Sequence, residues 1–177
     1  MKLIVLDRDG VINHDSVAFI KSPQEWRPIP GSLNAISRLN QAGFHVIVAT
    51  NQSGIGRGLL DMAALNAIHD KMHSALAQAG ARVDAIFFCP HAADDHCRCR
   101  KPNIGMFEDI AHRLNTSLSG VPIVGDSIRD LQADAAAQAL PLLVLTGNGR
   151  KTKRSGGLPP NTCVFADLAA VVDSLVD

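Results

Sequence analysis

The sequence predicts an α/β fold built on a doubly wound parallel sheet. Two observations point to this class: short apolar runs recur along the chain, and stretches with helical spacing separate them. With 177 residues, of which 46% are hydrophobic and 19% charged, the chain can bury a large core but is too short for two full domains. We therefore expect a single domain over residues 1–177.

Five apolar runs are the predicted strands. The first, residues 2–6, reads KLIVL and ends at an acid. The others occupy residues 44–49, 83–88, 121–124 and 141–145. Runs this short and this apolar are typical of strands that are buried on both faces, as in a parallel sheet.

Three apolar stripes with helical spacing lie between the strands. Their members are Leu33, Ile36 and Leu39; then Leu65, Ile68, Met72, Leu76 and Ala79; then Phe107, Ile110 and Leu114. Gly43 is placed to end the first helix, and Asp61 has a suitable side chain to cap the start of the second. Each stripe is expected to pack on the sheet as core.

Two segments show neither the strand period nor the helix period. Residues 13–30 hold three prolines and the only tryptophan, which predicts an irregular flap too short to be a cap domain. Residues 146–162 are rich in Gly, Pro and basic residues and predict a loop before a last helix at about 166–176, with the basic run 150–154 solvated. Cys163 is expected to be a small buried hydrophobe.

Charge and the N-terminal residues limit the partners. The 17 Lys and Arg residues balance the 17 Asp and Glu residues, so no overall basic field favours nucleic acid or an anionic membrane. The apolar run at residues 3–6 is far shorter than a signal peptide or a membrane span. We therefore expect a cytoplasmic monomer without a nucleic-acid or membrane partner.

Polar residues gather at four of the predicted strand ends. In an open parallel sheet, ligands bind just beyond the carboxyl ends of the strands. The segments at these ends are Asp7–Gly10, Thr50–Gly54, Arg100–Pro102 and Gly125–Asp130. Because such ends converge, the four segments are expected to form one site.

The acids among these residues predict a divalent metal ion. Asp7 and Asp9 point to the same side of an extended chain. With Asp126 and Asp130 alongside, the negative charges would repel one another unless a cation lay among them. Oxygen-only ligands at this density suit Mg²⁺ better than a soft metal.

A second metal is predicted by the cysteines. Cys89, Cys97 and Cys99 fall within eleven residues, whereas a disulfide framework would spread its cysteines along the chain. Three thiolates and one imidazole complete a closed tetrahedral zinc site, which is structural because no position is left for water. From the residues alone either His91 or His96 could be the fourth ligand, although His96 is awkwardly close to Cys97.

In order and spacing, four motifs resemble those of the haloacid dehalogenase superfamily of phosphatases, which transfer phosphoryl groups through an aspartyl phosphate. The matching residues are Asp7-Arg8-Asp9-Gly10, Thr50-Asn51, Lys101-Pro102 and Gly125-Asp126 with Asp130. The resemblance implies a Rossmann-like haloacid dehalogenase fold, here capless and with a small zinc-binding loop. More narrowly, residues 6–13, 50–58 and 89–102 resemble heptose bisphosphate phosphatases, and histidinol-phosphate phosphatases share much of this pattern.

The resemblance also implies a role for each site residue. Asp7 would be the nucleophile, and Asp9 would be the general acid and then the general base. Asp7, the backbone carbonyl of Asp9, and Asp126 would hold Mg²⁺, while Asp130 would orient Lys101 or the water shell of the metal. Lys101 and Thr50 would hold the transferring phosphoryl group. The zinc ligands that it implies are Cys89, His91, Cys97 and Cys99.

The substrate that this resemblance implies is a small phosphorylated sugar. Its contacts would be Asp15, Ser16, Val17, Ala18, Asn51, Gln52, Ser53, Arg57 and Arg100. The implied reaction removes the 7-phosphate of a D-glycero-D-manno-heptose 1,7-bisphosphate, on the route to bacterial lipopolysaccharide precursors. Histidinol phosphate is the alternative substrate, because the five-residue gap between His91 and Cys97 resembles the zinc loop of either family.

Two alternatives come from other classes of protein. A phospho-accepting receiver domain also combines strand-end acids, Mg²⁺, a Thr and a Lys, but its phospho-acceptor follows the third strand, where this chain has Cys89-Pro90-His91. A zinc loop that serves only as an interaction module is disfavoured by the surrounding acids. A P-loop kinase is excluded because the sequence has no G-x-x-x-x-G-K-[ST] motif.

Overall fold

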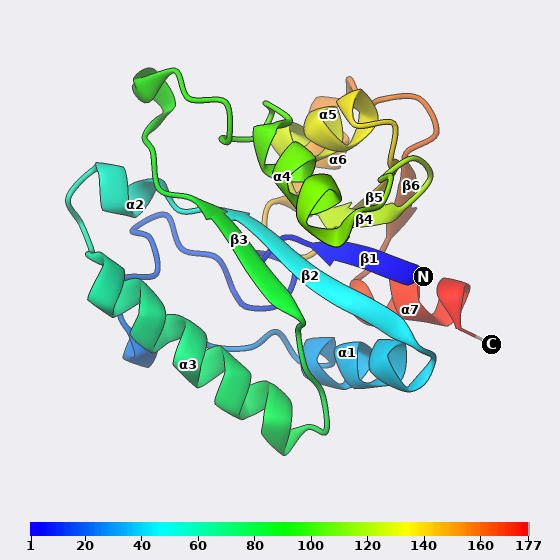
Figure 1. Ribbon diagram of the computed structural model, residues 1–177, viewed down its shortest axis with the longest axis horizontal. Coiled ribbons are helices and arrows are strands. Elements are labelled where there is room, and N and C mark those ends of the chain that lie inside the picture. The colour runs from blue at the N-terminus through cyan, green and yellow to red at the C-terminus, as the bar shows by residue number, and fades with distance from the viewer. Residues whose placement is uncertain (177) are drawn as a thin grey trace.

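The computed structural model describes residues 1–176, and these contain a six-stranded parallel sheet with helices on both faces (Figure 1). The strands are β1 (Lys2–Leu6), β2 (Phe44–Asn51), β3 (Ala85–Cys89), β4 (Pro122–Gly125), β5 (Leu140–Val144) and β6 (Cys163–Phe165). They lie in the order β3-β2-β1-β4-β5-β6, and every neighbouring pair is parallel. The predicted doubly wound class and its five strands are confirmed.

The helices fall on the two faces of this sheet. Their bounds are α1 (Ser32–Gln41), α2 (Ser53–Gly56), α3 (Met62–Gln78), α4 (Gly105–Leu114), α5 (Ile128–Ala136), α6 (Gly149–Ser155) and α7 (Leu168–Leu175). Figure 1 shows α1, α3 and α7 below the sheet and α4 and α5 above it. The Asp61 carboxylate accepts a hydrogen bond from the Ala64 N–H at 2.8 Å and so caps α3 as predicted.

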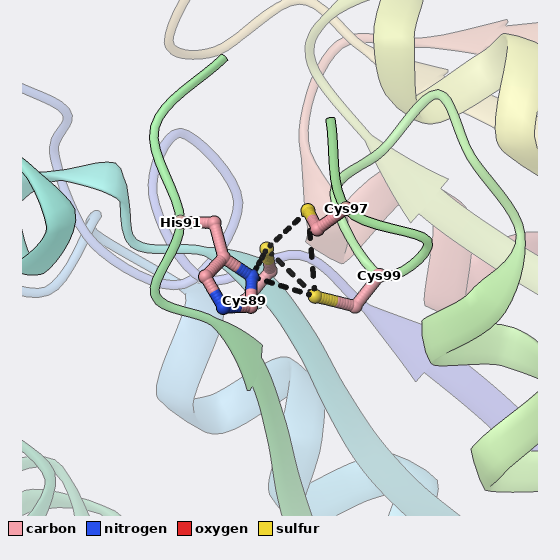
Figure 2. Close-up of side chains that lie close together, drawn as sticks. All are labelled: Cys89, His91, Cys97 and Cys99. Carbon is pink, nitrogen blue, oxygen red and sulfur yellow. Dashed lines mark hydrogen bonds between the residues drawn. The ribbon is translucent and has the colours of Figure 1, made fainter. Parts of the chain in front are cut away.

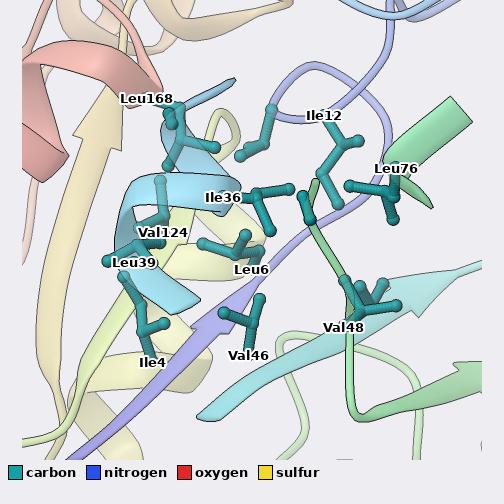
Figure 3. Packing of buried hydrophobic residues seen from close by; sticks show 14 of the residues in the cluster. Ile4, Leu6, Ile12, Ile36, Leu39, Val46, Val48, Leu76, Val124 and Leu168 are labelled. Carbon is teal, nitrogen blue, oxygen red and sulfur yellow. The ribbon is translucent and has the colours of Figure 1, made fainter. Parts of the chain in front are cut away.

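Alternating side chains of the central strands form two separate core layers. From β1, Ile4 and Leu6 pack with α1, α3 and α7 in the cluster drawn in Figure 3. Leu3 and Val5 point the other way and join the cluster that contains residues of α4. The flap contributes Trp26, which is fully buried in the first layer, so this irregular segment is packed against the domain.

Two predictions about the C-terminal part are wrong. Cys163 is exposed, because it begins β6, a three-residue strand at the edge of the sheet. Residues 149–155 form α6 inside the segment that was expected to be a loop. The basic residues of the run 150–154 are exposed on this helix, while Thr152 between them is buried and points inward.

The order of the strands reverses between β1 and β4, which are direct neighbours. Asp7 follows β1 and donates its backbone N–H to the Val124 carbonyl at 2.9 Å, and Asp126 follows β4. Ligands of doubly wound sheets bind at such a reversal. Among the described residues, no helix is both long and apolar enough to cross a membrane.

Candidate active site

A cavity of about 180 Å³ opens at the carboxyl ends of the strands. All four predicted strand-end segments contribute to its lining. The residues that carry the predicted chemistry and line it are Asp7, Asp9, Thr50, Lys101, Asp126 and Asp130. The structure therefore brings together residues that lie more than 100 positions apart in the sequence.

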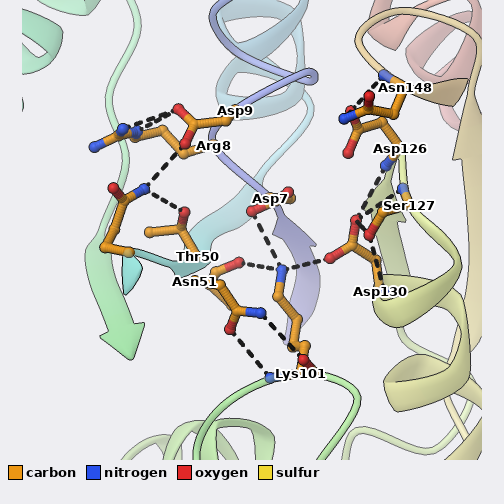
Figure 4. A network of polar contacts seen from close by, with 12 residues as sticks. Asp7, Arg8, Asp9, Thr50, Asn51, Lys101, Asp126, Ser127, Asp130 and Asn148 are labelled. Atoms are coloured by element: carbon orange, nitrogen blue, oxygen red, sulfur yellow. Dashed lines mark hydrogen bonds and ion pairs between the residues drawn. The ribbon is translucent and has the colours of Figure 1, made fainter. Parts of the chain in front are cut away.

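Lys101 is a buried cation in the lining of the cavity (Figure 4). Its Nζ lies 3.2 Å from Asp7 Oδ1 and 2.7 Å from Asp130 Oδ1, and it donates to the Ala49 carbonyl at 2.9 Å. Burial alone would lower the pKa of Lys101, but the carboxylates of Asp130 and Asp7 raise it. Lys101 is thus held as a fixed positive charge beside Asp7.

Asn51 fixes the backbone of Lys101. The side-chain amide of Asn51 donates to the Lys101 carbonyl and accepts from the Lys101 N–H, both at 3.1 Å. These two hydrogen bonds join the end of β2 to the loop that leads out of the cysteine cluster. The position of the Lys101 ammonium therefore depends on that loop.

Three carboxylates could share a metal ion. Asp7, Asp126 and Asp130 each place an oxygen within 4.8 Å of the others. Burial raises the pKa of Asp7 to about 7 and that of Asp126 to about 8, and neighbouring carboxylates add to both shifts. Burial also acts on Asp130, but the charge of Lys101 and the hydrogen bonds from Lys101 and Ser127 together lower the pKa of that carboxyl. A hard divalent cation fits this oxygen set, because it would let Asp7 and Asp126 ionise together.

Asp126 sits in a tight backbone cradle. Its Oδ2 accepts the Asn148 N–H at 2.7 Å. Gly10 and Gly147 have φ values of 84° and 56°, and a Cβ on them would lie 2.0 Å and 2.2 Å from Asp126 Oδ2. The positive φ values favour glycine, and the close approach of Asp126 leaves no room for a Cβ at either position.

Sequence reasoning missed Asn148. Its side-chain amide donates to Asp15 Oδ2 at 2.9 Å, and its backbone N–H donates to Asp126. Asn148 therefore links the flap to Asp126. The signal was available, because Thr146-Gly147-Asn148 follows the fifth strand just as the other site segments follow theirs.

The carboxylate of Asp9 is oriented by side chains from three segments. Arg8 Nε and Asn13 Nδ2 each lie 2.9 Å from Asp9 Oδ1. Gln52 Nε2 donates to Asp9 Oδ2 at 3.1 Å and to Thr50 Oγ1 at 2.9 Å. Gln52 therefore connects Asp9 with Thr50, two residues that are expected to lie at the phosphoryl group.

The predicted substrate contacts divide into two groups. Those that line the cavity are Asp15, Ser16, Val17, Asn51, Gln52, Ser53 and Arg100. Among the described residues, the lining does not include Ala18 or Arg57; the Arg57 guanidinium lies over the Phe19 ring, 5.7 Å from its centroid. Arg129, which sequence reasoning did not single out, lines the cavity beside Arg100.

Arg100 and Arg129 add positive charge to the lining of the cavity. Burial lowers the pKa of Arg100, and the positive charges of Arg129 and Arg57 lower it further. Mutual repulsion of this kind would be relieved by a bound anion.

The four predicted zinc ligands form one cluster (Figure 2). Cys89 Sγ lies 2.9 Å from Cys99 Sγ and 3.6 Å from Cys97 Sγ, and the Cys97 and Cys99 sulfurs are 3.7 Å apart. His91 Nδ1 lies 3.3 Å from Cys99 Sγ. A zinc–sulfur bond of about 2.3 Å places tetrahedral sulfurs about 3.8 Å apart, close to the two separations that involve Cys97, whereas Cys89 and Cys99 lie closer together. Three thiols and one imidazole nitrogen are a donor set that fits zinc. The fourth member of the cluster is His91 and not His96.

The acids at the neighbouring ends of β1 and β4 and the buried lysine between them are the arrangement expected of phosphatases of the haloacid dehalogenase class. Residues 2–139 match the family model described as polynucleotide kinase 3 phosphatase. A solved L-2-haloacid dehalogenase shares the fold, with a TM-score of 0.57 at 15% identity over 85% of this chain and 57% of its own.

Similar proteins of known name identify the family within this superfamily. D-glycero-beta-D-manno-heptose-1,7-bisphosphate 7-phosphatase of Bordetella bronchiseptica is 65% identical over 176 residues, 99% of this chain and 98% of its own. The enzyme of that name from Pseudomonas putida is 50% identical, over 99% of this chain and 100% of its own. The crystal structure of the B. bronchiseptica D,D-heptose 1,7-bisphosphate phosphatase with magnesium and phosphate matches at a TM-score of 0.98 and 65% identity, over 99% of this chain and 98% of that one. The chain belongs to the D-glycero-D-manno-heptose-1,7-bisphosphate 7-phosphatase family of the haloacid dehalogenase superfamily.

Proposed function

We propose that this protein is a phosphatase that removes the 7-phosphate of D-glycero-D-manno-heptose 1,7-bisphosphate through an aspartyl phosphate on Asp7. The observation that carries the proposal is the Asp7 carboxylate at the end of β1, 3.2 Å from the buried Lys101 ammonium, with Asp126 beside it. The 65% identity with the B. bronchiseptica enzyme, over 99% of this chain, supports the particular substrate.

We propose that Asp7, Asp126 and the backbone carbonyl of Asp9 hold Mg²⁺, which B. bronchiseptica phosphatase binds together with phosphate. When bound, Mg²⁺ would neutralise the phosphoryl oxygens and favour the ionised form of Asp7. The Lys101 ammonium and the Thr50 hydroxyl hold the same oxygens from the protein side. Asp130 acts by positioning Lys101, 2.7 Å away.

Two steps complete the reaction. An oxygen of Asp7 attacks phosphorus, the bond from phosphorus to the sugar oxygen breaks, and protonated Asp9 gives its proton to that oxygen. The Asp9 carboxylate then takes a proton from water as the water oxygen attacks the phosphorus of the aspartyl phosphate. Inorganic phosphate leaves, and Asp7 is restored together with protonated Asp9.

We assign zinc to Cys89, His91, Cys97 and Cys99 in a structural role. Four protein ligands fill its tetrahedral shell, so the metal would hold the loop that carries Lys101 and take no part in the chemistry.

We further propose that the chain works as a single-domain, cytoplasmic monomer without nucleic-acid or membrane partners. One sheet spans residues 2–165, and the thiols of the zinc cluster are unpaired, as a reducing compartment would keep them. Light scattering during gel filtration tests the monomer, and a dimer mass would contradict it.

Heptose 1,7-bisphosphate should exceed heptose 7-phosphate in kcat/KM by about tenfold or more, because a charge-assisted phosphate contact contributes roughly 1.5 to 3 kcal/mol. Arg100 lines the cavity next to Lys101 and is the candidate partner for the distal phosphate. Arg100→Ala should remove most of the preference and affect the monophosphate less. Steady-state kinetics of the wild type and of Arg100→Ala on both substrates measures the preference for the bisphosphate.

Arg98→Ala is the matched control, since Arg98 is exposed on the same loop and pairs with Glu108. It should leave the preference unchanged. Histidinol phosphate should be a poor substrate, because its distal end is cationic and would face Arg100 and Arg129. If histidinol phosphate were turned over as well as heptose bisphosphate or better, the protein would be a histidinol-phosphate phosphatase with the same catalytic residues.

Mg²⁺ should stabilise the protein more at about pH 8.5 than at about pH 7, because only ionised carboxylates bind the metal. Without Mg²⁺, the folded pKa values of about 7 for Asp7 and about 8 for Asp126 lie above those of the unfolded chain. At these two carboxyls the folded state then binds more protons than the unfolded state, so their contribution to stability falls as the pH rises through this window. Asp130, whose pKa is lowered, and His69, whose pKa is lowered to about 4, change stability mainly at lower pH.

Thermal unfolding with and without MgCl₂ at the two pH values measures the effect, without chelator so that zinc is retained. Asp126→Asn should reduce both the Mg²⁺ shift and its pH dependence. An equal Mg²⁺ shift at the two pH values would contradict this expectation.

A further inference from the structure

Arg8 is a buried cation to which the mechanism above gives no role. In the sequence it stands between Asp7 and Asp9, and its side chain is 0% exposed. Its Nε and Nη2 are each 2.9 Å from Asp9 Oδ1, and its Nη1 is 3.1 Å from Nε2 of His69 on α3. Because a buried guanidinium is costly unless it is well paired, these contacts are a specific feature of the site.

His69 must accept the hydrogen bond from Arg8. A guanidinium can only donate, so His69 Nε2 carries no proton and the neutral ring keeps its proton on Nδ1. His69 is buried at 7% exposure. Burial, and then the positive charge of Arg8, lower the pKa of His69 to about 4, in agreement with a neutral ring.

The contacts of Asp9 distinguish its two oxygens. Oδ1 accepts from both Arg8 and Asn13, which occupies the two lone pairs of that oxygen. Oδ2 accepts from Gln52, its one hydrogen-bond donor within residues 1–176, and so keeps a lone pair free. Since Asp9 lines the cavity, Oδ2 is the oxygen left to exchange a proton with substrate or water.

We propose that Arg8 and His69 are positioning residues for Asp9: neutral His69 holds the guanidinium of Arg8, which holds Oδ1 and leaves Oδ2 to act as acid and base. This inference rests on the proposed acid–base role of Asp9. It predicts that the loss of the His69 acceptor would impair proton transfer more than substrate binding.

The test is the dependence of the first turnover on the leaving group. A sugar alkoxide needs a proton as it leaves, whereas p-nitrophenolate leaves without one. His69→Leu removes the acceptor and should slow the first-turnover release of heptose 1-phosphate from heptose bisphosphate by about tenfold or more, since general acid catalysis contributes roughly 10²-fold to 10⁴-fold. The first-turnover burst from p-nitrophenyl phosphate should change by less than about twofold.

Two further variants make the readout specific. His69→Gln places an amide oxygen near the position of Nε2 and should recover most of the lost rate. His73→Leu, at an exposed position one turn later on α3, should match the wild type with both substrates. Equal slowing of both substrates by His69→Leu, or no slowing, would overturn the positioning role.

Asp9→Asn separates this inference from the proposed function. If Asp9→Asn slows both first turnovers equally, the acid–base role of Asp9 is wrong. If Asp9→Asn acts selectively and His69→Leu does not, only the positioning role is wrong.

Nitrogen NMR of the wild-type protein gives a second test, which does not depend on a folded variant. Between about pH 6 and 8, His69 should be the neutral tautomer protonated on Nδ1. A proton on Nε2 would overturn the inference.

Discussion

Asp7→Asn should abolish turnover while the protein stays folded. An amide keeps the shape of the side chain but is a very poor nucleophile, so we expect the rate to fall by about 10⁴-fold or more. Folding should survive, because Lys101 keeps its 2.7 Å contact with Asp130 and burial disfavours the Asp7 charge. Steady-state assays and thermal unfolding measure the two effects.

Asp109→Asn, at an exposed position on α4, is the matched control and should keep full activity. Beryllium fluoride with Mg²⁺ should bind the wild-type protein at Asp7 and should not bind Asp7→Asn. If purified Asp7→Asn kept more than about a few per cent of the wild-type rate, the aspartyl-phosphate mechanism would be wrong.

Removal of zinc should lower stability and activity together. We expect about one zinc per chain, and Cys99→Ser should lower Tm by about 10 °C, which corresponds to roughly 3 kcal/mol for a chain of this size. Activity should fall as well, because the cluster and the Asn51 contacts at 3.1 Å together fix the loop that carries Lys101. Elemental analysis, thermal unfolding and turnover measure these effects.

Cys163→Ser provides the control for this experiment. Cys163 is an exposed cysteine on β6, and its replacement should leave zinc content, Tm and rate unchanged. A zinc-free protein with the wild-type Tm and rate would show that protein contacts alone order the loop.

The central features of the fold and site could be predicted because they follow from local patterns. Short apolar runs indicated the strands, and the carboxyl ends of parallel strands must converge, which brought Asp7 and Asp126 together. Three cysteines within eleven residues indicated the zinc cluster. The composition of residues 163–165 did not reveal an edge strand, because a short apolar run reads the same whether it is buried or exposed.

Contacts between distant residues could not be predicted in this way. The pairing of Arg8 with His69 joins residues 61 positions apart, and that of Asn148 with Asp126 joins residues 22 apart. No periodicity links such partners, since they meet only when α3 and the segment after β5 pack on the sheet. Sequence patterns therefore located the reacting groups but not the residues that hold them.

The cradle of Asp126 bears on the smallest active fragment of the protein. All four phosphatase motifs lie within residues 2–139, the stretch that matches the family model. Asp126 is nevertheless held by the Asn148 N–H at 2.7 Å and by the Thr152 hydroxyl, which donates to its backbone carbonyl at 2.8 Å. A chain trimmed to residue 139 would keep every motif but lose the contacts from Asn148 and Thr152 that hold Asp126 in place. We therefore expect an active fragment to extend beyond the four motifs.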